Sequence, residues 1–114
     1  MGNLKTKFAG LELNSPIIAG SCGLTSDIKR LQEIEVAGAG AVVLKSIFEE
    51  QINMEASRSI GDNSYPEETD YIQNYIRANT VQQYIDLVKL AKERLKIPVI
   101  ASINCLSNGE WISF

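Results

Sequence analysis

The sequence predicts an α/β fold: the N-terminal portion of a TIM (β/α)8 barrel with a preceding β-hairpin, truncated after the third barrel strand. Three short apolar runs have the composition of buried parallel strands, and each follows a turn or a helix pattern. A closed eight-stranded barrel takes roughly 250 residues, whereas this chain has 114. We therefore expect one incomplete barrel domain over residues 1–114, with its β/α units from residue 16 onward.

The hairpin is expected at residues 4–13. Apolar and polar residues alternate there with a period of two, and Ala9-Gly10 interrupts the alternation, as a tight turn containing glycine does. Residues 14–16 (Asn-Ser-Pro) end the hairpin, and an apolar run over residues 17–19 begins the first barrel strand. A loop of small residues follows at 20–23.

The first crossover helix is expected after a Ser26-Asp27 cap. Apolar residues recur at three-residue spacing from Ile28 to Ile34, and the pattern ends at Gly38. The run Ala41-Val-Val-Leu44 is apolar throughout, which is typical of a parallel strand that is covered on both faces. This run is therefore the second barrel strand.

The next β/α unit has a long connection. Residues 47–79 are predicted to form a βα loop that includes a short helix at 49–58 and a cluster of turn-forming residues at 61–66. Apolar residues mark one helical face from Thr80, a plausible cap, to Leu95. These patterns predict a second crossover helix that begins near Thr80.

The third strand is expected at residues 98–104, directly after this helix. A pattern that resembles a capping box follows at residues 107–110. We therefore expect residues 111–114 to form the first turn of a third helix.

Composition excludes several classes of function. The chain is 45% hydrophobic and 22% charged with a net charge of −3, and its Lys and Arg residues form no basic stripe, which argues against nucleic-acid binding. Its longest apolar runs reach about five residues, far short of the roughly 20 that cross a bilayer, and no signal-peptide pattern is present. We expect a cytoplasmic protein with a small-molecule partner, no nucleic-acid partner and no membrane partner.

The residue types also restrict the chemistry. Because the chain has no His, neither a Ser-His-Asp triad nor a His-based zinc site can be built from it. Cys22 and Cys105 lack CxxC spacing, so the sequence predicts reduced, structural thiols and no metal site. The adjacent pairs Glu49-Glu50 and Glu67-Glu68 are interpreted as solvated loop charge rather than as a paired acid and base.

Candidate ligand-binding residues stand where the predicted strands end, since ligands of such barrels bind at that edge. These ends carry Ala19-Gly20-Ser21, Lys45-Ser46 and Ser102-Ile103-Asn104. Small residues let the backbone approach a flat ring, a Lys complements an anion, and an Asn donates and accepts hydrogen bonds. An unpaired buried ammonium is costly, so Lys45 either reaches solvent or binds an anion. Gly20 has a tight turn as its alternative role, and Ser46 has that of a loop hydroxyl.

Two longer stretches resemble a known family. Asn14-Ser-Pro-Ile-Ile-Ala-Gly-Ser21 after a Gly-Leu-x-Leu hairpin, followed by Ala37-Gly-Ala-Gly-Ala-Val-Val-Leu-Lys-Ser46, is similar to the start of dihydroorotate dehydrogenases and closely related flavin-dependent proteins. The resemblance covers nearly all of the chain. It implies an FMN-containing barrel of pyrimidine biosynthesis that oxidises dihydroorotate to orotate, in which the flavin takes hydride from C6 while a base removes the C5 proton.

The resemblance also implies roles for individual residues. Ala19, Gly20 and Ser21 would line the flavin, Lys45 would contact flavin and substrate, Ser46 would contact the flavin, and Asn104 would hydrogen-bond the ring system. Asn63 would contact the substrate, although Pro66 stands where the family's loop has a Gly. The family's catalytic base, a Cys or Ser after the fourth strand, is expected beyond residue 114, and Cys105 lies one strand too early for that role.

Two alternatives stay open. The first is another FMN barrel that acts on a different unsaturated or heterocyclic acid, which the altered Asn63-Ser-Tyr-Pro66 loop would suit. The second is a truncated fragment without catalytic activity that acts only by self-association, because three parallel strands without closure leave unpaired edges. We expect a homo-oligomer, and no dehydrogenase turnover from this chain alone.

Overall fold

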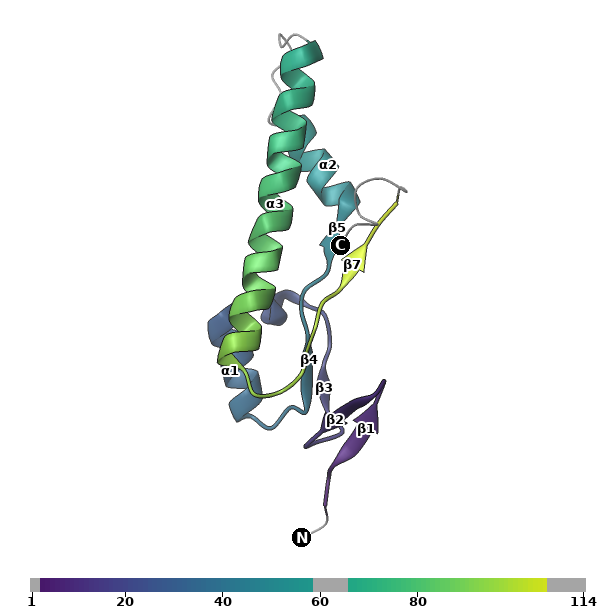
Figure 1. Cartoon of the computed structure of the whole chain (residues 1–114), viewed down its shortest axis with the longest axis vertical. Helices are drawn as coiled ribbons and strands as arrows, with labels where there is room; N and C mark the ends of the chain where they lie inside the picture. Colours follow the sequence, from purple (N-terminus) through teal and green to yellow (C-terminus); the bar gives the residue numbers. More distant parts are fainter. Residues whose placement is uncertain (1–2, 59–65, 107–114) are drawn as a thin grey trace. The chain divides into compact units, whose positions relative to one another are not determined.

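A computed structural model describes residues 3–58 and 66–106 (Figure 1). Over these residues the structure is mixed α/β, with three α-helices and small sheets, none of which closes into a barrel. The α/β prediction is confirmed at this level, while the barrel stays a prediction. Contacts divide the chain into two compact units, Met1–Ser46 with Asp86–Ser102 and Ile47–Ile85 with Ile103–Phe114.

The first unit begins with the predicted hairpin, in which β1 (Thr6–Phe8) pairs antiparallel with β2 (Leu11–Leu13). Ala9 and Gly10 connect the strands with φ angles of 48° and 79°. Both residues therefore occupy the left-handed region that the favoured two-residue hairpin turns require. Leu13 ends β2 with a side chain that is only 2% exposed, so the hairpin contributes an apolar anchor to the unit.

A parallel sheet in the order β3-β4-β6 forms the centre of the first unit. Its strands are β3 (Ile18–Ala19), β4 (Ala41–Val43) and β6 (Val99–Ile100). Val42 in the middle strand and Leu44 directly after it are fully buried, as expected for a strand that is covered on both faces. The sheet order follows the order of the strands in the chain, with a helical connection between neighbours.

The first connection contains the predicted helix, α1 (Ile28–Val36). Asp27 caps its first turn by accepting a backbone N–H at 3.4 Å. Gly38, with a φ of 104°, ends the helix. The N–H of Ala39 then donates to the carbonyl of Ile34 at 3.3 Å, which is the bond of a Schellman motif.

The second unit has a different construction. It contains β5 (Ile47–Phe48) parallel to β7 (Ile103–Asn104), α2 (Glu49–Arg58), and the part of α3 (Pro66–Arg94) up to Ile85. Its core is formed by Ile47, Ile52 and Val81, with Tyr84 and Ile85 packed against them. Arg77 donates to the side chain of Asn53 at 2.8 Å, and so links α3 to α2.

Of three predictions for this region, one is confirmed and two are wrong. The short helix at 49–58 is confirmed. The loop predicted up to residue 79 is wrong, because α3 already begins at Pro66, and proline is well tolerated in the first turn of a helix. Thr80 lies inside α3 and donates to the carbonyl of Ile76 at 2.9 Å, so it is not a cap.

The third predicted strand, residues 98–104, is divided into β6 and β7 with Ala101 and Ser102 between them. β6 belongs to the first unit and β7 to the second. The expected capping box at 107–110 and the turn after it lie outside the described residues.

Candidate functional site

The candidate site lies at the carboxyl edge of the β3-β4-β6 sheet. Because the three strands are parallel, the segments that follow them all leave the sheet at this edge. Gly20-Ser21 follows β3, Lys45-Ser46 follows the end of β4, and Ala101-Ser102 follows β6. All of these residues belong to the first unit.

Two hydrogen bonds link three serine hydroxyls from these segments, and Ser46 takes part in both. The Oγ atoms of Ser21 and Ser46 are 3.0 Å apart, and those of Ser46 and Ser102 are 2.5 Å apart. The backbone N–H of Ser46 also donates to Ser21 Oγ at 2.9 Å. We call Ser21, Ser46 and Ser102 the serine chain. It connects three successive strand ends through side chains, with Ser46 at its centre.

Gly20 leaves open space at this edge. A Cβ built on Gly20 would meet nothing within 4 Å, and its backbone is not in the left-handed region. Neither packing nor backbone conformation therefore requires glycine at this position. The absence of a side chain leaves the backbone accessible here, as it does at Gly23, and the ligand role and the turn role both stay predictions.

Lys45 has its backbone fixed and its side chain exposed. Its N–H donates to the carbonyl of Thr25 at 3.3 Å, while the side chain reaches solvent. Of the two possibilities derived from the sequence, the structure shows the solvent-exposed one. The ammonium group follows β4 at the carboxyl edge, where an anionic ligand could bind it.

Two residues of this region were missed in the assignment from sequence. Ser102 stands at a predicted strand end but received no role; a hydroxyl residue within three positions of the end of each strand is the signal that could have found it. Thr25 is fully buried, and its hydroxyl bonds to the N–H and the carbonyl of Cys22 at 3.2 and 3.0 Å. The buried Thr25 side chain thus stabilises the loop after β3 through its hydrogen bonds to the Cys22 backbone.

The remaining candidate residues have separate positions. Ala19 is half-buried as the last residue of β3 and pairs in register with Val42. Asn104 is exposed at the end of β7 in the second unit, opposite Phe48. The expected convergence of Asn104 with the serine chain therefore stays a prediction. Asn63 lies outside the described residues.

Cysteines and carboxylates give no metal centre in the part of the chain that the structure describes. Cys22 and Cys105 are free and exposed, so neither belongs to a buried core. No three His, Cys, Asp or Glu side chains among residues 3–58 and 66–106 are grouped as metal ligands.

None of the helices described here has both the length and the apolar character needed to cross a membrane.

The interpretation of Glu49 as solvated loop charge is wrong. Its side chain is only 5% exposed, and Oε2 accepts the backbone N–H of Leu106 at 2.6 Å. Glu49 starts α2, where a carboxylate is stabilised by the helix dipole. This residue therefore joins α2 to the segment after β7 within the second unit, while Glu50 is exposed.

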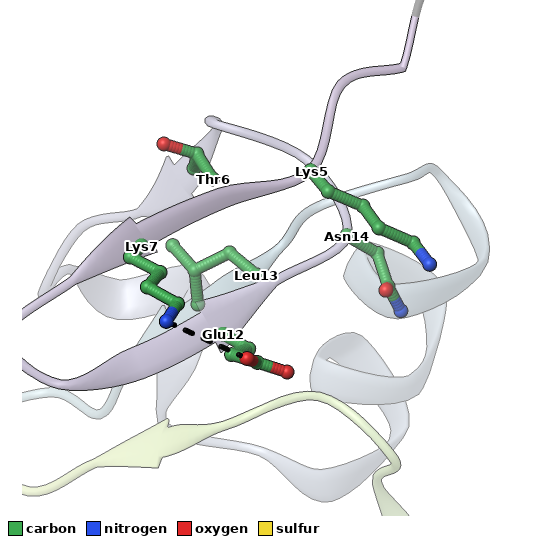
Figure 2. Close-up of a pocket in the computed structure, with 6 residues that line it drawn as sticks. All are labelled: Lys5, Thr6, Lys7, Glu12, Leu13 and Asn14. Atoms are coloured by element: carbon green, nitrogen blue, oxygen red, sulfur yellow. Dashed lines mark ion pairs between the residues drawn. The ribbon is translucent and has the colours of Figure 1, made fainter.

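A surface hollow of about 380 Å³ lies on the hairpin (Figure 2). Its lining residues are Lys5, Thr6, Lys7, Glu12, Leu13 and Asn14. The Nζ atom of Lys7 is 3.9 Å from a carboxylate oxygen of Glu12, and both side chains are mostly exposed. Because all of these residues precede β3, the hollow is a feature of the hairpin and not of the carboxyl edge of the sheet.

Comparison of the chain with protein-family models, with curated proteins and with solved structures finds no match. The geometry of the carboxyl edge follows from hydrogen bonds and open space in this chain and does not depend on any such match.

Proposed function

We propose that this chain binds FMN and belongs to an FMN-dependent oxidoreductase that resembles dihydroorotate dehydrogenases. The observation that carries the proposal is the meeting of Gly20, Lys45 and the serine chain at one sheet edge. Parallel α/β folds bind their ligands at this edge. The proposal includes a cytoplasmic location and the barrel architecture expected for the family.

The residues at this edge fit a flavin. Open space above Gly20 suits the close approach of a flat ring, and the hydroxyls of Ser21 and Ser46 can bond to the polar edge of a heterocycle. Ala19 would line the ring beside them. Lys45 would place a positive charge next to it. When bound, FMN would supply the hydride acceptor.

The proposed substrate is a small heterocyclic acid, dihydroorotate or one similar to it. Lys45 is exposed beside the candidate flavin site, so its ammonium can pair with a substrate carboxylate as well as with an anionic ring. Asn63 would contribute a further substrate contact. In this proposal the residues of this chain bind and orient, and none of them acts as the catalytic base.

A second candidate is a non-catalytic role in self-association. β3 and β6 are the outer strands of the three-stranded sheet, so each has a hydrogen-bonded neighbour on one side among the described residues. Such edges can pair with strands of another copy. This candidate predicts a homo-oligomer that binds no flavin, whereas the first predicts flavin binding whatever the oligomeric state.

Titration of the purified 114-residue chain with FMN, followed by flavin fluorescence and visible absorbance, tests the first candidate. The proposal predicts saturable binding with one FMN per chain. Light scattering on the same sample reports the mass relative to the 12.6 kDa of one chain. A colourless oligomer that leaves added FMN unbound would contradict the flavin proposal and support self-association.

A further inference from the structure

Ser46 occupies a special place in the serine chain. A hydroxyl group has one hydrogen to donate and two lone pairs to accept with, which gives it three hydrogen-bonding positions. Two of these positions of Ser46 are directed to Ser21 and Ser102, at 3.0 and 2.5 Å. No residue described by the structure occupies the third. Ser46 is half-buried, so its hydroxyl is held by the protein without being sealed from the solvent side.

The third position can be either a donor or an acceptor. If both neighbours donate to Ser46, its own hydrogen is available to a ligand. If Ser46 donates to one neighbour, a lone pair is available instead. Hydroxyl hydrogens rotate to suit their partners. The serine chain can therefore change between the two arrangements while its oxygen atoms stay in place.

Ser21 and Ser102 fix the position of this oxygen from two other strand ends. Ser21 Oγ is itself held by the N–H of Ser46 at 2.9 Å, which ties the hydroxyl to the backbone of the segment after β4. Ser102 approaches from the segment after β6. Removal of either hydroxyl would take away one of the two contacts that hold the Ser46 oxygen, so that the side chain could adopt other rotamers and move this oxygen.

We propose that Ser21 and Ser102 are positioning residues that let the Ser46 hydroxyl both donate to and accept from one ring atom of a bound heterocycle. The ligand class that needs this property is a redox-active heterocycle, in which a ring nitrogen accepts a hydrogen bond when oxidised and carries an N–H when reduced. The hydride that reduces it, a proton with two electrons, comes from a C–H bond of the substrate, which is thereby oxidised. This inference rests on the proposed flavin site.

A hydroxyl that can either donate or accept differs measurably from one that can only donate, in how its removal changes the affinities for oxidised and reduced flavin. A fixed donor would favour the oxidised ligand alone, and its loss would change the reduction potential of the bound flavin. A hydroxyl that serves both forms contributes to the binding of each. Its loss should therefore weaken the binding of oxidised and reduced FMN by similar factors. The reduction potential of bound FMN should then stay close to its value in the unaltered chain.

The test uses the full chain with FMN and with dithionite-reduced FMN under anaerobic conditions. For Ser46→Ala we expect the Kd of both forms to rise by similar factors, roughly 3- to 10-fold. For Ser21→Ala and Ser102→Ala we expect rises of roughly 2- to 5-fold in both forms. Ser21→Thr and Ser102→Thr keep a hydroxyl and should retain more of the affinity than the alanine variants.

Ser57→Ala is the matched control, because the Ser57 hydroxyl donates to the carbonyl of Asn53 within α2 at 2.8 Å. It should bind both forms as the unaltered chain does. Thermal unfolding of every variant identifies any alanine variant that fails to fold; in that case the threonine variant at the same position, with Ser46→Thr added for Ser46, is compared with the unaltered chain.

Each outcome decides a different point. Loss of affinity for only one redox form in Ser46→Ala would overturn the reversible role. Unchanged affinity in folded Ser21→Ala and Ser102→Ala, with weakened binding in Ser46→Ala, would overturn the positioning role and leave the flavin site standing. If the unaltered chain binds neither form, the proposed function falls, and this inference falls with it.

Discussion

The two edges of the β3-β4-β6 sheet are built in opposite ways, although the same strands supply both. At the amino edge, a Cβ added to Gly40 would lie 2.0 Å from the carbonyl oxygen of Ser15, and the N–H of Gly40 donates to Ile17 at 2.7 Å. At the carboxyl edge, a Cβ added to Gly20 would meet nothing within 4 Å. One glycine is required by packing within the chain, and the other is not.

Hydrogen bonding shows the same contrast. At the amino edge, Oε1 of Glu35 accepts the backbone N–H groups of Lys96 and Ile97 at 2.6 and 3.2 Å, and so joins α1 to the turn before β6. At the carboxyl edge, Ser46 keeps a hydrogen-bonding position beyond those used by Ser21 and Ser102. We infer that the amino edge serves stability and the carboxyl edge serves binding, a division known from β/α barrels.

The largest expected effect is at Gly40. In Gly40→Ala the added methyl group would overlap the backbone of Ser15, and backbone cannot move aside as a flexible side chain can. We expect the free energy of unfolding to fall by about 3 kcal/mol, as measured by urea denaturation. A loss below about 1 kcal/mol would show that the amino edge has more room than the geometry indicates.

Glu35→Ala should have the next largest effect on stability. It removes the acceptor of two backbone N–H groups, those of Lys96 and Ile97, and we expect a loss of about 2 kcal/mol. Glu35→Gln keeps an oxygen acceptor and should lose less. Amide hydrogen exchange at Ile97 provides the direct readout. Unchanged protection there in Glu35→Ala would contradict the joining role of this carboxylate.

A smaller effect of opposite sign is expected in the hairpin. Ala9 has a φ of 48°, a conformation that costs a non-glycine residue roughly 1 kcal/mol. Ala9→Gly should therefore raise the melting temperature slightly and leave FMN binding unchanged. A lower melting temperature would mean that the entropy lost by glycine on folding outweighs the relieved strain.

Local patterns predicted the parts of the first unit that depend on neighbouring residues. The hairpin, α1 with its end at Gly38, and the buried strand β4 follow from alternation, capping and apolar composition. The start of α3 was predicted wrongly, because no continuous apolar stripe marks residues 66–79. Its packing depends on long-range contacts, such as the bond between Arg77 and Asn53, which a local pattern does not contain.

Some residues of the candidate site were predictable from the sequence, but Ser102, Thr25 and the hydrogen bonds between the strand ends were not. Strand ends identified Gly20, Ser21, Lys45 and Ser46 from sequence alone. The hydrogen bonds of the serine chain depend on the register between parallel strands that are distant in sequence, so they required the structure. The difference between Gly20 and Gly40 depends likewise on what each glycine faces in space.

The most direct test of the account is Gly20→Ala, measured for both stability and FMN affinity beside Gly40→Ala. We expect Gly20→Ala to unfold within about 1 kcal/mol of the unaltered chain, on the stabilising side if at all, and to weaken FMN binding by roughly tenfold or more. A Gly20→Ala chain that binds FMN as tightly as the unaltered chain, or that is destabilised as much as Gly40→Ala, would contradict the assignment of the carboxyl edge to ligand binding.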